Sequence, residues 1–335
     1  MLAATLAASA ASIGTSTGNA RALSSPPPAT WSRYVTTTNL YTPGCNQGRW
    51  SDTNHVNDIV VILDFGKMYY QNGSYGAVDW GVGFRTTTQI AATAETFLQG
   101  FWDCTKLNSP SNVNVAIGTN NCTTDPNCVY SNTTYAGGQA WGNMVKSVNS
   151  WVVSKRYSAQ EYATGANDME VDWESAANTR NWADGYTNVS NYPYYDYGDA
   201  AGCPTSGQTS ANRNCATPHE TWTQNDLYYL VWQEAVGWPL PEIYLNDNTQ
   251  SKQWQQITLY GYLAHSGNRI EFTTGLSQSQ ACADVGDPCT GKNLSPSGSF
   301  NSLYNTLNAD SRTAPNPTSS YEFRWATTMA WNNSQ

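Results

Sequence analysis

The sequence contains few charged residues. Asp, Glu, Lys and Arg make up only 12% of its 335 residues, which is about half the usual share. Acidic residues outnumber basic ones, 25 against 16, so the formal charge is −9. Because so acidic a chain has little attraction for a phosphate backbone, we expect no nucleic-acid partner.

Motifs that identify several common classes of protein are also missing. No Gly-x-Gly-x-x-Gly follows a predicted strand, which argues against a dinucleotide cofactor. No Gly-x-x-x-x-Gly-Lys-Ser/Thr loop occurs, which argues against a nucleotide-binding P-loop. No Cys-x-x-Cys spacing occurs either, and His55, His219 and His265 lie near no cysteine pair that would complete a zinc site. The sequence therefore predicts no cofactor, and we assign no residue to a metal.

The eight cysteines lie in turn-like surroundings. An even number of cysteines in such loops is typical of disulfides formed in an oxidising compartment. Three local pairs are expected, and the two remaining cysteines form the fourth: Cys122 with Cys128, Cys203 with Cys215, Cys282 with Cys289, and Cys45 with Cys104.

The N-terminal residues have the composition of an export signal. Residues 2–13 are apolar and rich in Ala, and Ala20-Arg21-Ala22 fits a small-x-small cleavage site. We therefore expect a signal-peptide remnant at 1–22, an extended segment at 23–50 and a single domain at 51–335. No later apolar run reaches the length of a membrane span. The expectation is a secreted monomer without a membrane segment.

Short apolar runs alternate with segments of helical periodicity. Strands are predicted at 59–64, 113–117, 169–173, 194–197, 228–232, 243–245, 270–274 and 323–331. Helices are predicted at 89–102, 138–153, 176–186, 250–263 and 300–307. This alternation is typical of α/β proteins with a parallel sheet. We predict an irregular (β/α)8 barrel with disulfide-tied loops, and a doubly wound sheet is the alternative.

Four acidic residues alternate with apolar ones in the third predicted strand. They are Asp168, Glu170, Asp172 and Glu174. On a strand, residues two apart project from the same face, so all four carboxylates would lie side by side. Like charges this close raise one another's pKa. Catalysis, a bound cation or structural acids would each account for such a ladder.

This run resembles the motif of glycoside hydrolase family 18, which includes chitinases and endoglucosaminidases. That family carries Asp-Gly-x-Asp-x-Asp-x-Glu on its fourth barrel strand, and residues 167–174 read Asn-Asp-Met-Glu-Val-Asp-Trp-Glu. Asp168 replaces the family's Gly, and Glu170 replaces its middle Asp. The resemblance implies that Glu174 is the general acid, that Asp172 turns toward it, and that the substrate N-acetyl group is the nucleophile.

Glycosidic cleavage needs a proton donor and a second carboxylate. A crowded carboxylate cluster supplies the donor, because repulsion keeps one group protonated. We assign catalysis to Glu174, with Asp172 and Glu170 tuning it, and Asp64, Asp247 or Glu234 as candidates for the second carboxylate. The catalytic set is therefore Glu174, Asp172, Glu170 and Asp64.

Substrate-binding candidates lie at other predicted strand ends, where a barrel places its active site. The chain has 14 Trp and 21 Tyr, and aromatic rings of this kind can stack on sugar faces. The candidates are Asp168, Asn120, Trp173, Trp232, Asn246, Asp247 and Trp331. The sequence thus predicts a secreted glycoside hydrolase acting on a neutral or amino-sugar polysaccharide. The alternative is a non-catalytic glycan-binding or cell-surface protein whose acidic ladder holds a cation.

Overall fold

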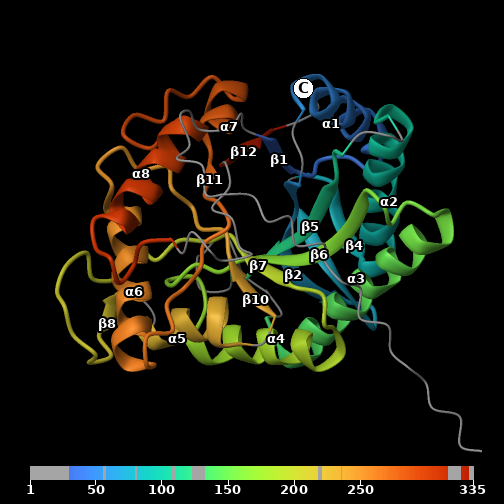
Figure 1. The fold of residues 1–335 in the computed structure, drawn as a ribbon. Coiled ribbons are helices and arrows are strands. Elements are labelled where there is room, and N and C mark those ends of the chain that lie inside the picture. The colour runs from blue at the N-terminus through green and yellow to red at the C-terminus, as the bar shows by residue number, and fades with distance from the viewer. Residues whose placement is uncertain are drawn as a thin grey trace, which may run out of the picture.

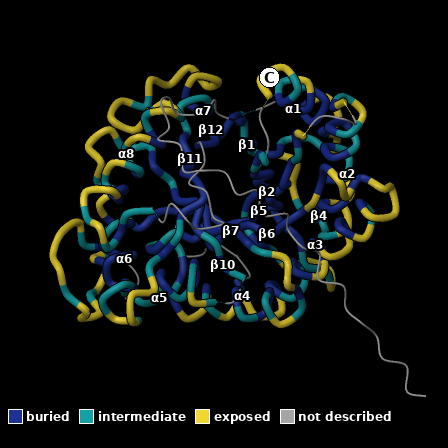
Figure 2. Tube along the Cα trace, in the orientation of Figure 1, coloured by how far each residue is buried: buried dark blue, intermediate teal, exposed yellow. Residues whose placement is uncertain are grey.

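The chain folds as a mixed α/β protein in the computed structural model. The structure describes residues 30–55, 58–79, 81–106, 110–122, 133–217, 221–234, 236–315 and 326–331. The expected signal peptide and Cys128 lie outside these ranges, as do His219 and Glu220. Figure 1 shows helices arranged around a curled sheet, and Figure 2 shows that the buried residues follow the sheet.

Parallel strands form the main sheet. In chain order its parallel strands in the described residues are β1 (Thr30–Tyr34), β2 (Ile59–Gln71), β5 (Val113–Asn120), β6 (Glu161–Asp168), β7 (Tyr194–Asp196), β10 (Gly237–Pro239), β11 (Leu276–Ser277) and β12 (Thr327–Ala330). They are hydrogen-bonded in the order β10-β7-β6-β5-β2-β1-β12-β11, and every pair in this order is parallel. Parallel strands that follow one another in the chain therefore lie side by side, except β10 and β11, which are the two edges of the sheet. In addition, the first strand pairs with the last.

The sheet curls but is not closed by a continuous ladder. Its two edge strands, β10 and β11, approach each other through one parallel bridge between Glu242 and Leu276. Two hydrogen bonds of 2.8 Å accompany this bridge, from Ile243 N–H to the Leu276 carbonyl and from Leu276 N–H to the Pro241 carbonyl. The observed architecture is thus a curled, half-barrel parallel sheet, which agrees with the predicted irregular (β/α)8 barrel in its α/β class and parallel strands but is not closed.

Two smaller β-structures accompany the main sheet. Strands β3 (Ser74–Asp79) and β4 (Gly83–Thr86) extend the end of β2 as antiparallel neighbours. Strands β8 (Asn214–Ala216) and β9 (Thr221–Thr223) form a separate antiparallel pair. Neither was predicted, because both consist of short and largely polar segments.

The helices pack around the sheet in chain order. Their bounds are α1 (Tyr41–Asn54), α2 (Thr87–Cys104), α3 (Tyr135–Lys155), α4 (Ala176–Val189), α5 (Gln224–Tyr228), the π-helix η1 (Tyr229–Gln233), α6 (Thr249–Ala264), α7 (Ser279–Asp284) and α8 (Pro296–Asn308). Helix α1 packs on α2, α2 on α3 and α3 on α4, while α6 packs on α5 and α8. None of the described helices is long and apolar enough to cross a membrane.

Several sequence predictions are confirmed, and others are wrong. The strands predicted at 59–64, 113–117 and 194–197 and all five predicted helices are present, mostly with longer bounds. Within the strand predicted at 323–331, the described residues 326–331 contain β12. Residues 228–232 are helical instead of extended, and no strand forms at 243–245 or 270–274. The extended segment expected at 23–50 instead contains β1 and most of α1, which continues to Asn54. The polar composition of these two elements explains why periodicity did not reveal them.

Disulfides link several of these elements. Three of the expected pairs are present: Cys45–Cys104, Cys203–Cys215 and Cys282–Cys289. Cys122 is also disulfide-bonded. The first bond joins α1 to the end of α2, and the second joins the segment after β7 to β8. These bonds are consistent with folding in an oxidising compartment.

Candidate functional site

The acidic ladder does not form a strand. Strand β6 ends at Asp168, and residues 169–174 continue as an irregular segment and a turn, in which Trp173 N–H donates to the Glu170 carbonyl at 3.3 Å. The strand predicted at 169–173 is therefore wrong, and so is the common face for all four carboxylates. Asp168 alone among the four occupies the carboxyl end of a strand, where parallel α/β sheets place their sites.

A buried amide fixes the position of Glu170. Asn121, which is fully buried, accepts a hydrogen bond from Glu170 N–H at 3.0 Å through Oδ1. Its Nδ2 donates to the Glu170 carbonyl and to Thr179 Oγ1, both at 3.1 Å. The Asn121 backbone N–H also donates to the Asp168 carbonyl. These bonds take the place of the backbone hydrogen bonds that Glu170 would form in a strand. They hold Glu170 beside the edge of the sheet.

The ends of β6, β7 and β10 are joined in the same way. Asp196, the last residue of β7, accepts from Gly198 N–H at 3.0 Å and from Met169 N–H at 3.4 Å. A Cβ at position 198 would lie 2.5 Å from the Met169 carbonyl oxygen, so only glycine permits this approach. The Gly198 carbonyl in turn accepts from Glu242 N–H at 3.1 Å. Glu242 is thereby brought to the segment that carries Asp168 and Glu170.

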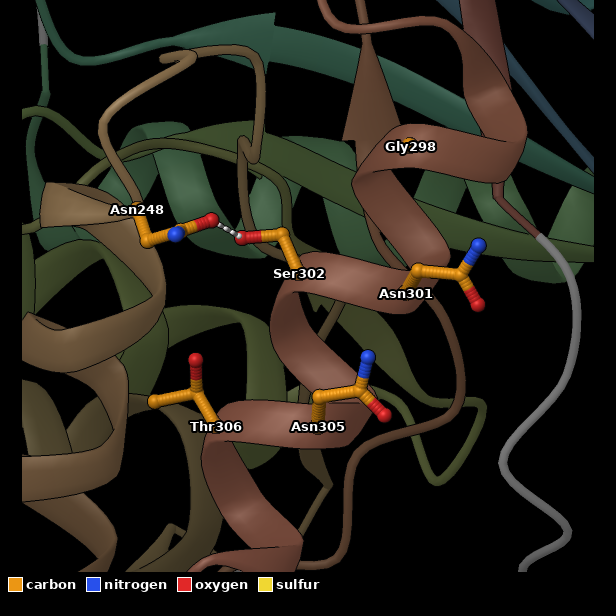
Figure 3. Close-up of a pocket in the computed structure, with 6 residues that line it drawn as sticks. All are labelled: Asn248, Gly298, Asn301, Ser302, Asn305 and Thr306. Carbon is orange, nitrogen blue, oxygen red and sulfur yellow. Dashed lines mark hydrogen bonds between the residues drawn. The ribbon is translucent and has the colours of Figure 1, made fainter.

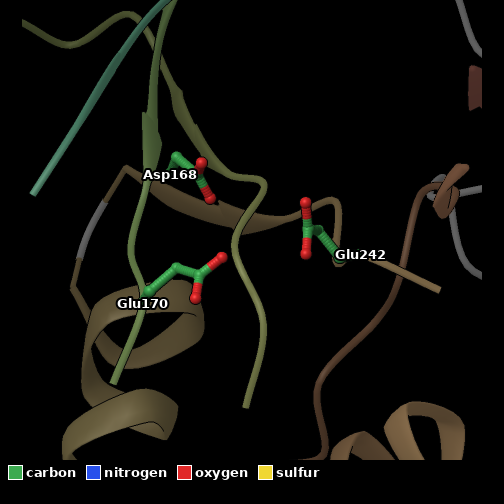
Figure 4. Close-up of side chains that lie close together, drawn as sticks. All are labelled: Asp168, Glu170 and Glu242. Atoms are coloured by element: carbon green, nitrogen blue, oxygen red, sulfur yellow. The ribbon is translucent and has the colours of Figure 1, made fainter. Parts of the chain in front are cut away.

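Asp168, Glu170 and Glu242 form a compact carboxylate cluster. Each offers one oxygen, and the three oxygens lie within 4.8 Å of one another. Figure 4 shows the carboxylates of Asp168 and Glu170 directed from one segment toward that of Glu242, which comes from another. Asp168 is only 8% exposed, and its Oδ1 has no hydrogen-bond partner among the described residues. We call these three residues the acid cluster.

Burial and mutual repulsion oppose ionisation of the acid cluster. Burial raises the pKa of Asp168, and Glu242 and Asp64 raise it further. Burial also raises the pKa of Glu170, with additional effects from Asp199 and Asp168. Because three close carboxylates cannot all remain charged without a counter-ion, the cluster either retains protons near neutral pH or holds a cation.

Glu242 differs from its two neighbours in having a hydroxyl donor. Burial and Asp199 raise its pKa, but a hydrogen bond from the Tyr244 side chain lowers it. A donor to the carboxylate stabilises the charged form. Among the three carboxyls of the cluster, Glu242 is the one whose charged form receives a hydroxyl donor, although its pKa remains well above its usual value.

More acids and aromatic rings surround the acid cluster. Burial raises the pKa of Asp196 to about 7 and that of Asp199 to about 6. Tyr34 pairs with Asp64 in the β1–β2 ladder, and burial, Asp64 and the three cluster carboxylates all raise the pKa of its hydroxyl. Its ring contacts that of Trp331, with centroids 4.3 Å apart. An aromatic pair thus lies beside the carboxylates.

Several residues predicted for the site do lie at this sheet edge. Asp64 is fully buried and accepts from Gly66 N–H, and its charge acts on Asp168. Asn120 pairs with Asp168 across the β5–β6 ladder. Asp172 acts on Glu170 and Asp199 through its charge.

Glu174 is placed differently from its predicted role. Its carboxylate Oε1 accepts from Ser175 N–H at 2.7 Å and from the Asn178 side chain at 3.0 Å. It is 6% exposed and lies at the start of α4. Carboxylates are favoured at helix N-termini because they satisfy free N–H groups and the helix dipole. Ser175 is the N-cap of α4 and accepts from Asn178 N–H, and the Glu174 carboxylate bonds to both of these residues and supports the start of the helix.

Three other predicted residues make contacts away from the acid cluster. Asp247 Oδ1 accepts from Thr249 N–H at the start of α6, and Asn246 donates to the Asn293 side chain. Trp232 donates to Asn268 and packs against the core on the helix side of the sheet. Trp173 lies in the turn after Glu170.

Sequence reasoning missed Glu242, Asn121 and Asp196. Glu242 follows Trp238-Pro-Leu-Pro241, and because proline disfavours central strands, the strand was predicted to begin only at residue 243. An acidic residue directly after this apolar run was the sequence signal that could have identified Glu242 as a site residue. Asn121 and Asp196 follow or end strands that were predicted, but buried polar contacts between distant segments have no sequence periodicity.

Comparison with known proteins identifies no family. No protein-family model matches the sequence, and the search of curated proteins gives no significant match.

Proposed function

We propose that this protein hydrolyses glycosidic bonds, with Glu170 as the proton donor and Glu242 as the ionised carboxylate. The facing carboxylates of the acid cluster carry this proposal. Glu170 is surrounded by other acids that oppose its ionisation, as a proton donor requires. Glu242 has the hydroxyl donor that favours its charged form.

We also propose that the curled sheet is an irregular (β/α)8 barrel with its seam between β10 and β11. The strand order supports this, because it follows the chain around the sheet and the Glu242–Leu276 bridge joins its two edges. Counted from β1, strand β6 is the fourth parallel strand, which is the position of the motif in glycoside hydrolase family 18. The likeness to that family now favours Asp168 and Glu170 at the strand end, and not Glu174.

The substrate that fits this site is a neutral or amino-sugar polysaccharide, and the protein that degrades it would be secreted. The Tyr34–Trp331 pair beside the acid cluster provides rings on which a sugar can stack. An acidic site in a chain of net charge −9 repels anionic polymers. The disulfides are consistent with an extracellular location.

The spacing of the carboxylates predicts hydrolysis with retention of anomeric configuration. Retaining enzymes place their two carboxyl groups about 5–5.5 Å apart, and inverting enzymes about 6.5–9.5 Å apart. One oxygen of Glu170 lies within 4.8 Å of one oxygen of Glu242, which is closer to the retaining separation than to the inverting one. Proton NMR of the first product formed from soluble β-glycans such as chitohexaose or cellohexaose should show the β-anomer. An initial α-anomer would exclude Glu242 as the nucleophile.

A second candidate function is supported by the same geometry. Three carboxylate oxygens within 4.8 Å could ligate Ca2+, and the protein would then bind glycans without cleaving them. At 100 times its Kd, Ca2+ would stabilise the fold by about 2.7 kcal/mol, measurable as a rise in Tm that Asp168→Asn abolishes. Catalysis by Glu170 instead predicts hydrolysis that continues in excess EDTA. Loss of all turnover on a broad glycan panel, together with the Ca2+-dependent rise in Tm, would favour the second function.

A further inference from the structure

A hollow in the helix layer has the features of a second ligand site. It lies between the segment that leads into α1 and helices α2 and α3, and its volume is about 340 Å³. Its lining residues are Asn39, Tyr41, Ala92, Glu95, Thr96, Gln99 and Trp151. None of these residues belongs to the acid cluster, so this hollow is separate from the site described above.

Aromatic rings form part of the wall of this hollow. Tyr41 is 39% exposed, and Trp151 is partly buried. Trp151 packs edge-on against Tyr157 at 5.6 Å, and Tyr157 stacks on Trp102 at 4.4 Å. The Trp151 ring is therefore held in place by neighbouring rings before any ligand binds.

Hydrogen bonds also fix the polar groups at the rim. The Tyr41 hydroxyl donates to Asp103 Oδ2 at 3.1 Å, and Gln99 Nε2 donates to Asp103 Oδ1 at 2.9 Å. The Tyr157 hydroxyl donates to Gln99 Oε1 at 3.0 Å. This network joins the start of α1 to α2 and to the segment after α3. A ligand would meet an ordered rim and lose little affinity to the ordering of side chains.

Glu95 adds a carboxylate to the lining. Burial raises its pKa, and Lys155 lowers it. Among the described residues Glu95 forms no ion pair. The hollow therefore offers a carboxylate, amides and a hydroxyl next to aromatic rings, and this mixture of donors and acceptors suits a ligand rich in hydroxyl groups.

Other ligand classes fit this hollow less well. The lining residues include no lysine or arginine, and Lys155 Nζ lies beside them, over the Trp151 ring at 5.7 Å from its centroid. One cation balanced by the Glu95 carboxylate in the same hollow gives little attraction for phosphate groups or nucleic acid. Its volume is at the lower end of the range for small-molecule sites, about 300–1,000 Å³, which disfavours a folded partner. A second hollow of about 290 Å³, between the start of α6 and α8, is lined by Asn248, Gly298, Asn301, Ser302, Asn305 and Thr306 and has no aromatic ring (Figure 3).

We propose that the hollow between α1, α2 and α3 binds neutral oligosaccharide, with a sugar ring stacked on Trp151 or Tyr41 and its hydroxyls bonded to Glu95 and Asn39. This binding does not depend on the acid cluster. It would attach the protein to a polysaccharide at a point separate from the site of cleavage.

The test measures binding in a protein that cannot consume the ligand. Chitohexaose, cellohexaose, mannohexaose and maltohexaose would be titrated into the Glu170→Gln variant while the indole N–H signal of Trp151 is followed by NMR. We expect at least one of them to shift this signal saturably. Adding Tyr41→Ala should weaken the binding measured at this signal about tenfold, as expected for the loss of one ring contact. Trp151→Ala lacks the signal, so its affinity, and for comparison that of Tyr41→Ala, would be measured by isothermal titration calorimetry, with the same loss expected.

Matched variants make the result decisive. Asn305→Ala alters the other hollow, and Tyr162→Ala removes an aromatic side chain that is 43% exposed elsewhere, so neither should change the affinity measured at Trp151. Unfolding by heat would identify a ring variant that fails to fold, in which case Glu95→Gln, which keeps the shape of the side chain, serves as the second test. No shift with any hexasaccharide, or equal affinity in the ring variants, would overturn the proposal. Binding at Trp151 by a protein that hydrolyses no glycan would uphold this site and refute the proposed function.

Discussion

Replacing Glu170 with Gln is expected to lower kcat by about 10³-fold while the protein remains folded. A general acid contributes about 10²–10⁴-fold, and an amide cannot supply its proton. Asn121 contacts the backbone of Glu170 and not its carboxylate, so the loop geometry should survive the substitution. Single-turnover kinetics on the best glycan substrate would measure the loss, and circular dichroism would verify the fold.

Glu174→Gln is the matched control for this experiment. It is the same chemical change four residues further along the same loop, at a carboxylate that bonds to the start of α4. We expect kcat to fall by less than about threefold, with a loss of stability of about 1 kcal/mol from the weakened cap. The opposite pattern, inactive Glu174→Gln and active Glu170→Gln, would restore the assignment made from the motif alone and refute the acid cluster as the catalytic site.

Replacing Glu161 with Gln is expected to stabilise the protein by about 3 kcal/mol at pH 7. Glu161 begins β6 at the end opposite the acid cluster and is 2% exposed. Burial, together with Asp103, raises the pKa of its carboxyl to about 9 from 4.5. Between these two values the unfolded chain releases a proton that the folded chain retains, so stability falls as pH rises. The wild-type protein loses about 1.4 kcal/mol of folding stability for each pH unit above 4.5. Gln does not titrate, so the variant does not lose this stability.

Chemical denaturation at several pH values would test this expectation. The gain should be absent at pH 4, where both states of the wild-type protein hold the proton, and should grow toward pH 8. Glu271→Gln is the control, because that carboxylate pairs with Arg269 at 3.2 Å and its removal should not stabilise the fold. A gain from Glu161→Gln that is equal at pH 4 and pH 8 would contradict the buried, protonated carboxyl.

The sequence allowed those parts of the fold to be predicted that depend on regular hydrophobic patterns. Strands β2 and β5 contain continuous buried apolar residues, and α2 and α3 bury regularly spaced ones, so their periodicity was clear. Helix α1 was missed because Pro43, Gly44 and Gly48 disfavour a helix. A Cβ at position 44 would lie 2.0 Å from the Phe97 carbonyl oxygen. Close packing of α1 on α2 thus requires a residue that lowers helix propensity, and this conflict is visible only in three dimensions.

The candidate site was predicted only in part for a related reason. Asp168 and Glu170 stood out because they belong to a dense local run of acids. Their partner Glu242 lies more than 70 positions away and reaches them through Gly198. The alternation that made Glu174 look like part of one face arose in a segment that turns toward α4. Local patterns identified the acidic segment, but long-range backbone contacts determine which acids meet.

The pairing of β1 with both β2 and β12 has a consequence for folding during synthesis. Ser32 Oγ contacts Thr327 Oγ1 at 2.9 Å across a separation of 295 residues, and β1 pairs with β12 along its length. During synthesis, one edge of β1 therefore stays unpaired until nearly 300 further residues have been made and β12 is available. Contacts this distant in sequence form slowly, and until they form, β1 leaves an unpaired edge that other chains can join. A chaperone that covers this edge until β12 has been made would prevent such pairing between chains.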